Sequence, residues 1–211
     1  EAVNRISTNT IDKPYISISS DDGFKNNLGA SRILDKYNIK ACFFINPDTI
    51  GLNNFSKVKD FCSERLNFPP TEFMNWSDID DLLNRGHEIG SHTMHHINVA
   101  KTNMITLKNN LEKSYEIIKQ RCGDVKHFAY PYGRYFHFSK EAYDMVFDTG
   151  YLSCASAERG CHISSKKNLT SDKILILRDQ IICDWNISHI MYFIMQNSRK
   201  SIPTNNFNCL S

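Results

Sequence analysis

Two short polar segments, far apart in the sequence, contain most of the residues of this chain that could perform chemistry. The first is SSDDG at 19–23 and the second is HTMHH at 92–96. One carboxylate and two imidazoles form a ligand set suited to zinc or a similar divalent ion with an open coordination position. A second carboxylate beside the first would remain free to act as a base. This combination predicts metal-assisted hydrolysis.

Both segments follow short apolar stretches that are expected to form strands, YISI at 15–18 and HEIGS at 87–91. In α/β proteins, catalytic residues gather where parallel strands end. The four-residue spacing of His92 and His96 would place both imidazoles on one face of a helical turn, so that one ion could bridge them. His95, three residues after His92, is the alternative second histidine ligand.

Strands and helices are expected to alternate along the chain. Short apolar or β-branched runs near turn residues predict strands at 15–20, 41–46, 87–92, 127–131, 151–156 and 174–179. One predicted helix begins with a capping box formed by Ser77 and Asp80. A long helix ends near Gly123, and a third runs from Ser139 to Gly150.

This alternation predicts an α/β fold with a mainly parallel sheet and right-handed crossovers. Chemistry at the strand ends favours a distorted or incomplete (β/α) barrel, and an open doubly wound sheet is the alternative. The segment 47–75 interrupts the alternation and is expected to be a substrate-side excursion with a short helix around 56–66. A length of 211 residues predicts a single catalytic domain over 1–211.

The composition argues against several classes of function. The formal charge is only +2 and the lysines are scattered, so nothing indicates binding to nucleic acid or to an anionic membrane surface. No apolar run approaches the ~18 residues of a membrane span. The seven cysteines have no CxxC spacing, which argues against a zinc ribbon or a thioredoxin-type motif. Free thiols predict a cytoplasmic location, although a signal or anchor could have been removed ahead of Glu1.

A third motif, FAYPYG at 128–133, follows the other two. In this order and at these intervals, the three motifs resemble the first three motifs of the polysaccharide deacetylase family, also known as the NodB-homology domain or carbohydrate esterase family 4. The resemblance runs from about residue 13 to about residue 180. It implies a NodB-type distorted (β/α) barrel and a metal-dependent hydrolase that removes the acetyl group from an N-acetylated sugar.

The resemblance also implies roles for individual residues. Asp22, His92 and His96 match the metal ligands. Zn²⁺ is the expected ion, and Co²⁺, Ni²⁺ or Mn²⁺ would also suit this ligand set. Asp21 matches the general base, which accepts a proton from the attacking water without binding the ion. Tyr132 matches the residue whose backbone N–H helps to stabilise the oxyanion.

The sequence departs from the family pattern in the third motif. Ala129 stands where many members have an arginine that orients the catalytic aspartate. Arg178, which follows the predicted strand around 174–177, is the first candidate to replace that arginine, and Arg134 is the second. The resemblance therefore predicts that Arg178 contributes to the catalytic site.

A second departure concerns the histidine that protonates the leaving amine, which has no clean counterpart here. His162, His189 and Asp21 itself, after it has taken the proton of the water, are the candidates. These departures leave open a catalytically weak or inactive carbohydrate-binding relic of the same fold. Retention of both Asp21 and Asp22 favours an enzyme, because a binding module has no need of a base. Hydrolysis of a phosphate or of another amide has less support, since the sequence has no Gly-rich phosphate cradle or arginine cluster.

Overall fold

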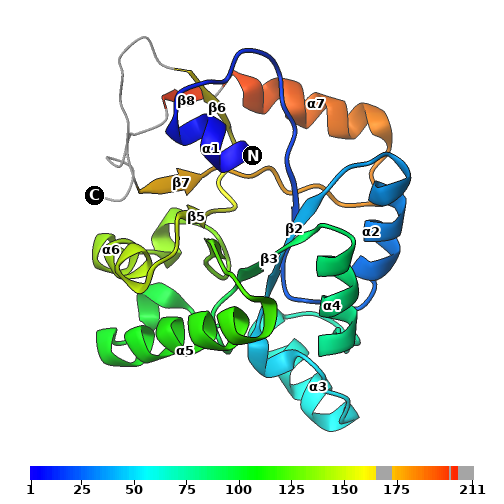
Figure 1. Cartoon of the computed structure of the whole chain (residues 1–211), viewed down its shortest axis with the longest axis vertical. Helices are drawn as coiled ribbons and strands as arrows, with labels where there is room; N and C mark the ends of the chain where they lie inside the picture. Colours follow the sequence, from blue (N-terminus) through cyan, green and yellow to red (C-terminus); the bar gives the residue numbers. More distant parts are fainter. Residues whose placement is uncertain (165–172, 200, 204–211) are drawn as a thin grey trace.

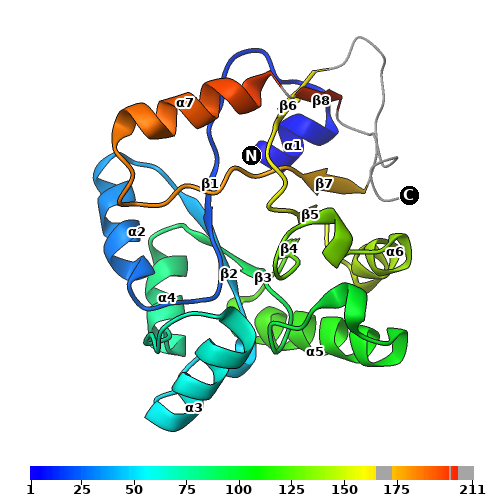
Figure 2. The same cartoon turned by 180° about the vertical axis from the view of Figure 1, so that it is seen from behind.

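A six-stranded, fully parallel sheet forms the centre of the molecule in the computed structural model, which describes residues 1–164, 173–199 and 201–203. The strands are β1 (Ile18–Ser20), β2 (Ala41–Ile45), β3 (Glu88–Ser91), β4 (His127–Ala129), β5 (Ser153–Ala155) and β7 (Ile174–Ile176). Their order in the sheet follows their order in the sequence. Such an order has no reversal point of the kind that divides a doubly wound sheet. The sheet curls into the predicted incomplete (β/α) barrel (Figures 1 and 2).

All six predicted strands are present, and each is shorter than its predicted range. The first differs most, because β1 pairs with β2 only from Ile18 onward and Ile16 is 81% exposed. The predicted strand therefore begins too early, because apolar residues that precede an edge strand need not be buried. Two further strands, β6 (Cys161–Ile163) and β8 (Ser201–Pro203), form a separate parallel pair that was not predicted. Their residues, CHI and SIP, include a histidine, a serine and a proline and so do not form an apolar run like those of the sheet strands.

Four helices follow one another around the outside of the sheet (Figure 1). They are α2 (Asn27–Lys36), α4 (Trp76–Asn84), α5 (Met104–Cys122) and α6 (Lys140–Thr149). The predicted ends of α5 and α6 are confirmed: Gly123 caps α5, and α6 lies between Ser139 and Gly150. The predicted capping box of α4 was misplaced.

The capping box of α4 is formed by Asn75 and Asp78, two residues before the predicted pair. Asn75 Oδ1 accepts the N–H of Asp78 at 3.0 Å, and Asp78 Oδ2 accepts the N–H of Asn75 at 2.9 Å. Ser77 lies inside the helix. Asparagine caps a helix as well as serine does, and an acidic residue three positions later completes either pair, so the sequence offered two equivalent boxes.

The segment 47–75 contains the short helix expected around 56–66. It consists of α3 (Phe55–Phe61) and a π-helical turn, η2 (Cys62–Leu66), and α3 projects from the rest of the molecule in both views (Figures 1 and 2). The remaining elements are α1 (Ala2–Ser7), α7 (Ile187–Ser198) and the 3₁₀ turns η1 (Pro47–Thr49), η3 (Val99–Lys101) and η4 (Tyr135–His137). Within the described ranges, no helix is long and apolar enough to cross a membrane.

The main hydrophobic core lies between the sheet and the surrounding helices. Ile79 of α4, Leu107 and Leu111 of α5, and Val146 of α6 have no exposed surface, and they pack with side chains of the strands. Burying an aliphatic side chain of this size stabilises the fold by about 1.5–3 kcal/mol. This packing holds the strands in register, so that the polar residues following each strand meet at one edge of the sheet.

Candidate metal centre and catalytic site

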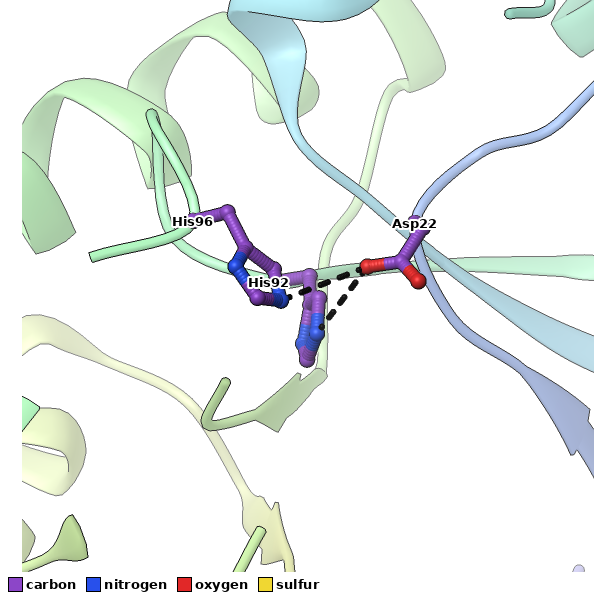
Figure 3. Close-up of side chains that lie close together, drawn as sticks. All are labelled: Asp22, His92 and His96. Carbon is purple, nitrogen blue, oxygen red and sulfur yellow. Dashed lines mark ion pairs between the residues drawn. The ribbon is translucent and has the colours of Figure 1, made fainter. Parts of the chain in front are cut away.

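Three side chains from two loops converge at the carboxyl ends of the strands. Asp22 follows β1, while His92 and His96 follow β3. Asp22 Oδ1 lies 3.5 Å from His92 Nε2 and 3.4 Å from His96 Nε2 (Figure 3). One ligand atom from each residue lies within 4.8 Å of the other two. The structure therefore brings the three predicted metal ligands together.

The chemistry of this cluster fits a divalent cation. Asp22 Oδ1 is buried and has no hydrogen-bond partner among the described residues, and burial raises the pKa of Asp22. Burial also lowers the pKa of His96 to about 3, which leaves this imidazole in the neutral form that binds metals. A buried carboxylate oxygen without a donor is costly unless a cation compensates it. One carboxylate and two neutral imidazoles are a suitable set for zinc or a similar ion.

A backbone carbonyl sets the orientation and tautomer of His92. Its Nδ1 lies 2.8 Å from the carbonyl oxygen of Ala129 at the end of β4. A carbonyl only accepts hydrogen bonds, so Nδ1 carries a proton, and the lone pair of the neutral imidazole is then on Nε2, the atom that faces Asp22. Such support of a ligating histidine increases its basicity and fixes its ring.

The loop that carries the two histidines is not the helical turn that their spacing suggested. Thr93 has φ 66° and His96 has φ 50°, and these left-handed residues interrupt any helical turn. The imidazoles meet because the loop folds tightly after β3. His95, the alternative ligand, lies outside the cluster, and its Nδ1 pairs with Asp48 Oδ2 at 3.1 Å. His96 is therefore the second histidine of the cluster.

Two buried asparagines that the sequence analysis missed hold this loop. Asn46, directly after β2, donates from Nδ2 to the carbonyls of His92 and Thr93, the latter at 3.0 Å. Asn110 of α5 accepts the N–H of Met94 through Oδ1 at 2.7 Å. The position of Asn46 at the end of the predicted strand 41–46 is a sequence signal for a role at the site. Nothing in the helical pattern of α5 indicates such a role for Asn110.

Asp21 lies beside the cluster but is not one of its three members. Arg178 donates from Nη1 to Oδ1 of Asp21 at 2.7 Å and from Nη2 to Oδ2 at 2.8 Å. It also donates from Nε to the carbonyl of Ser156 at 2.7 Å and from Nη1 to Ser19 Oγ at 3.0 Å. Burial raises the pKa of Asp21, but the charge and hydrogen bonds of Arg178, together with His92, outweigh it and hold this pKa at about 2.

Arg178 thus lies where the sequence analysis expected a replacement for the missing arginine. Arg134, the second candidate, pairs with Glu158 at 3.2 Å instead. Glu158 also accepts the N–H of Tyr135 at 2.9 Å, so its carboxylate fastens the segment after the third motif. No local pattern indicates this role of Glu158, because its partners are more than twenty residues away.

The third motif ends in a tight turn beside His96. Tyr132 has φ 65° and Gly133 has φ 66°. The carbonyl of Gly133 accepts the N–H of Ala157 at 2.8 Å, and a Cβ on Gly133 would lie 2.4 Å from the Cβ of Ala157. Only glycine fits such a close approach at a left-handed φ. The Tyr132 hydroxyl donates to the carbonyl of Arg65 at 3.0 Å. The side chain of Tyr132 is therefore held at its hydroxyl, and its backbone is held by the tight turn.

Neither histidine proposed as general acid touches Asp21 or the cluster among the described residues. His162 Nε2 accepts the N–H of Leu177 at 3.0 Å, and burial lowers the pKa of His162 to about 4. His189 is exposed on α7 and packs against the rings of Trp185 and Phe193. Six cysteines are unpaired, and the seventh, Cys209, lies outside the described residues.

Comparison with known proteins assigns the chain to a family. Residues 8–153 match the family model for polysaccharide deacetylase, and the chain belongs to this family. It is 31% identical over 122 residues to the peptidoglycan-N-acetylglucosamine deacetylase of Bacillus cereus, covering 56% of this chain and 36% of that protein. It is 28% identical over 133 residues to a bifunctional xylanase/deacetylase of Pseudobutyrivibrio xylanivorans, covering 61% of this chain and 18% of that protein. The chain therefore spans only a part of either relative.

Solved structures of low sequence identity share the fold. The deacetylase PplD of Streptococcus pyogenes, in complex with acetate, aligns with a TM-score of 0.71 and 13% identity over 91% of this chain and 76% of that chain. IcaB from Ammonifex degensii aligns with a TM-score of 0.63 and 15% identity over 92% and 78%. A family pseudoenzyme from Bacillus anthracis aligns with a TM-score of 0.50 and 18% identity over 68% and 43%. The fold alone therefore does not establish activity.

Proposed function

We propose that this protein is a metal-dependent carbohydrate N-deacetylase that removes the acetyl group from an N-acetylated amino sugar. The observation that carries the proposal is the cluster of half-buried Asp22 with buried His92 and His96, next to a separate carboxylate, Asp21, which Arg178 holds by both oxygens. A divalent ion in the cluster, with Zn²⁺ the best fit and Co²⁺, Ni²⁺ or Mn²⁺ compatible, would polarise the acetamide carbonyl and lower the pKa of a water molecule.

In the proposed reaction, Asp21 accepts a proton from the attacking water as the water oxygen bonds to the carbonyl carbon. Although burial raises the pKa of Asp21, the Arg178 guanidinium outweighs it and keeps this carboxylate ionised, so that it can accept the proton. The backbone N–H of Tyr132 stabilises the negative charge that develops on the carbonyl oxygen. The C–N bond then breaks, acetate leaves, and the amine takes up a proton.

We assign that last proton to Asp21, which carries it after the first step. His162 is less suited, because its Nε2 is already engaged by the N–H of Leu177. His189 is exposed on helix α7, where its ring packs against those of Trp185 and Phe193. A single carboxylate would therefore act first as base and then as acid.

The alternative function, an inactive carbohydrate-binding relic, was suggested partly by the alanine at position 129. The geometry weakens this argument, because the guanidinium of Arg178 supplies the bidentate contact to Asp21. A binding module would have no use for a carboxylate fixed beside a metal cluster. The cytoplasmic location remains a prediction, which the unpaired state of the six described cysteines favours.

The experiment that tests this function measures acetate release from a panel of N-acetylated sugars together with the metal content of the protein. We expect a chelator to abolish release and added Zn²⁺ to restore it. Asp22→Ala should lose the ion, whereas Asp21→Asn should keep the ion and lose a rate factor of roughly 10² to 10⁴, the usual contribution of a general base. Acetate release that is insensitive to chelator, or full activity in Asp21→Asn, would contradict the proposal.

A further inference from the structure

One side of helix α7 packs against the rest of the molecule. Phe193 and Ile194 are half-buried on this side, and the guanidinium of Arg159 lies 4.4 Å from the ring centroid of Phe193. Asn197 is buried and donates from Nδ2 to Asp179 Oδ1 at 2.6 Å. These contacts fasten α7 to the segments that follow β5 and β7.

The opposite side of α7 is also apolar, and it is exposed. Ile187, Met191 and Met195 follow one another at four-residue spacing, so they form a stripe along the helix. They are 73%, 48% and 60% exposed, and Tyr192 beside them is 58% exposed. A helix that is apolar all round is normally buried on all sides. Within the part of the chain that the structure describes, this stripe has no covering partner.

Helix α7 also differs in charge from the helices around the sheet. Its 12 residues include no Asp, Glu, Lys or Arg, whereas α2, α4, α5 and α6 each carry several. The solvent side of a helix normally carries charged residues, and an exposed apolar patch marks a surface at which another molecule binds. In both views α7 lies at the edge of the molecule, where a partner can reach it (Figures 1 and 2).

Charged residues of opposite sign lie at the two ends of the stripe. Asp184 precedes α7 and Arg199 is its C-cap residue, and both are exposed. In the sequence, the midpoint of these two residues coincides with Met191, the centre of the stripe, to within one residue. If a second copy of α7 packs antiparallel to the first, Asp184 of each copy therefore faces Arg199 of the other. A parallel arrangement would place like charges together.

We propose that the exposed stripe of α7 is the interface of a homodimer, in which the α7 helices of two copies pack antiparallel about a twofold axis at Met191. Ile187 of one copy then packs against Met195 of the other, and two pairs of Asp184 with Arg199 close the ends. A helix that lies on an anionic membrane surface would instead carry Lys or Arg on its polar face, which α7 lacks. This inference does not depend on the proposed function.

The first test measures self-association of the full chain by sedimentation equilibrium. A single pair of helices buries less surface than a permanent dimer interface does, so we expect a Kd of about 1–100 µM. Met191→Asp would place two carboxylates at the centre of the interface and should raise this Kd by about 100-fold or more. Met104→Asp is the matched control, because Met104 is also an exposed helical methionine, at 40%, but lies on α5. The control should leave Kd unchanged.

A charge exchange tests the antiparallel arrangement. Asp184→Arg alone would put like charges together at both ends of the interface. It should raise Kd by about 3- to 30-fold, the effect of losing two exposed ion pairs. Adding Arg199→Asp to the same chain should restore most of the wild-type affinity. A merely local disturbance at either position would not be rescued in this way.

Cross-linking tests the position of the twofold axis. The background carries Cys183→Ser and Cys209→Ser, which removes the exposed thiol and the one outside the described residues. Met191→Cys should then form a disulfide-linked dimer under mild oxidation, because a residue at a twofold axis faces its own copy. Met104→Cys, the matched control on α5, should remain unlinked.

The outcomes either support or overturn the inference. A dimer that responds to Met191→Asp, is rescued by the charge exchange and cross-links through Met191→Cys would support it, whether or not the protein releases acetate. A wild type that stays monomeric above this range of Kd, or a dimer that ignores these changes, would overturn it. Binding of a monomeric wild type to phosphatidylcholine vesicles that Met191→Asp abolishes would assign the stripe to lipid, and would also overturn it.

Discussion

Arg178 and Asp21 join the two edges of the open sheet. They are 157 residues apart in the sequence and form a bidentate pair with distances of 2.7 and 2.8 Å. Asp21 follows β1 and Arg178 follows β7, and these strands lie at opposite ends of the strand order. The guanidinium also lies over the ring of Phe44, 5.2 Å from its centroid. The pair therefore fixes the plane of the carboxylate inside the curve of the half-barrel.

The first prediction concerns Arg178→Lys. A lysine keeps the positive charge but cannot bind both oxygens in a fixed plane, so Asp21 should become free to rotate. We expect kcat for acetate release to fall by about 10- to 100-fold, with metal content unchanged, since small misplacements of a catalytic group have effects of this order. Steady-state kinetics and metal analysis on the same preparation check this.

Arg85→Lys is the matched control for that variant. Arg85 also contacts several groups, including Asp81 and Ser31, but these lie on the helices outside the sheet. This variant should lower stability without lowering kcat. Equal losses of kcat in both variants would mean that Arg178 has only a structural role.

The second prediction concerns Asn46→Ala. This change removes the amide that donates to the carbonyls of His92 and Thr93 and leaves both carbonyls buried without that donor. The histidine loop should then relax, and zinc affinity should fall by about 10- to 100-fold, as is typical when the groups that support metal ligands are lost. Competition with a chromogenic chelator measures this affinity.

Asn75→Ala provides the comparison. It removes the cap of α4 and should cost about 0.5–2 kcal/mol of stability, but it does not touch the histidine loop. Zinc affinity should therefore be the same as in the wild type. If both asparagine variants bind zinc like the wild type, Asn46 does not support the site.

The third prediction concerns Gly133→Ala. The new Cβ would lie 2.4 Å from the Cβ of Ala157 at a φ of +66°, so the turn that presents the Tyr132 N–H must move. We expect a loss of about 1–3 kcal/mol in stability, the range for overpacking, together with a marked fall in kcat. Gly51→Ala has a comparable φ of +84° but no atom within 4 Å of its new Cβ, and it should lower stability alone. An unchanged kcat in Gly133→Ala would remove this turn from the catalytic proposal.

The fourth prediction concerns stability at acid pH. Burial lowers the pKa of His162 from 6.5 to about 4. The unfolded chain therefore takes up this proton at a higher pH than the folded chain does. The contribution of His162 to the free energy of unfolding is fully present above about pH 6.5 and decreases as the pH falls toward 4. At 1.36 kcal/mol per pKa unit, the decrease is at most about 3 kcal/mol.

Urea unfolding at pH 7 and pH 4.5, in the presence of chelator, compares the wild type with His162→Gln. Glutamine can still accept the N–H of Leu177, but it does not titrate. The variant should lose less stability between the two pH values than the wild type does. If both lose the same amount, protonation of His162 does not contribute to acid unfolding.

Much of the fold could be read from local patterns. The six sheet strands, the ends of α5 and α6 and the parallel sheet follow from apolar runs, capping residues and the alternation of elements, whereas the NodB-type curl of the sheet was implied by the family resemblance. The elements that were not predicted correctly had weak or ambiguous sequence signals. β6 and β8 lack the apolar runs that marked the sheet strands, and the capping box of α4 had two equivalent candidates that begin two residues apart.

The sequence by itself determined which residue types stand at the ends of β1, β3 and β4, and therefore the three residues of the candidate metal cluster and the neighbouring Asp21. Only the tertiary structure decided how these groups are held. Arg178, Asn46 and Glu158 act on partners that are distant in the chain, and such contacts arise from strand order and loop packing, which leave no local pattern. Short-range periodicity records which face of an element is buried, whereas the orientation of a catalytic group depends on elements that meet only after folding.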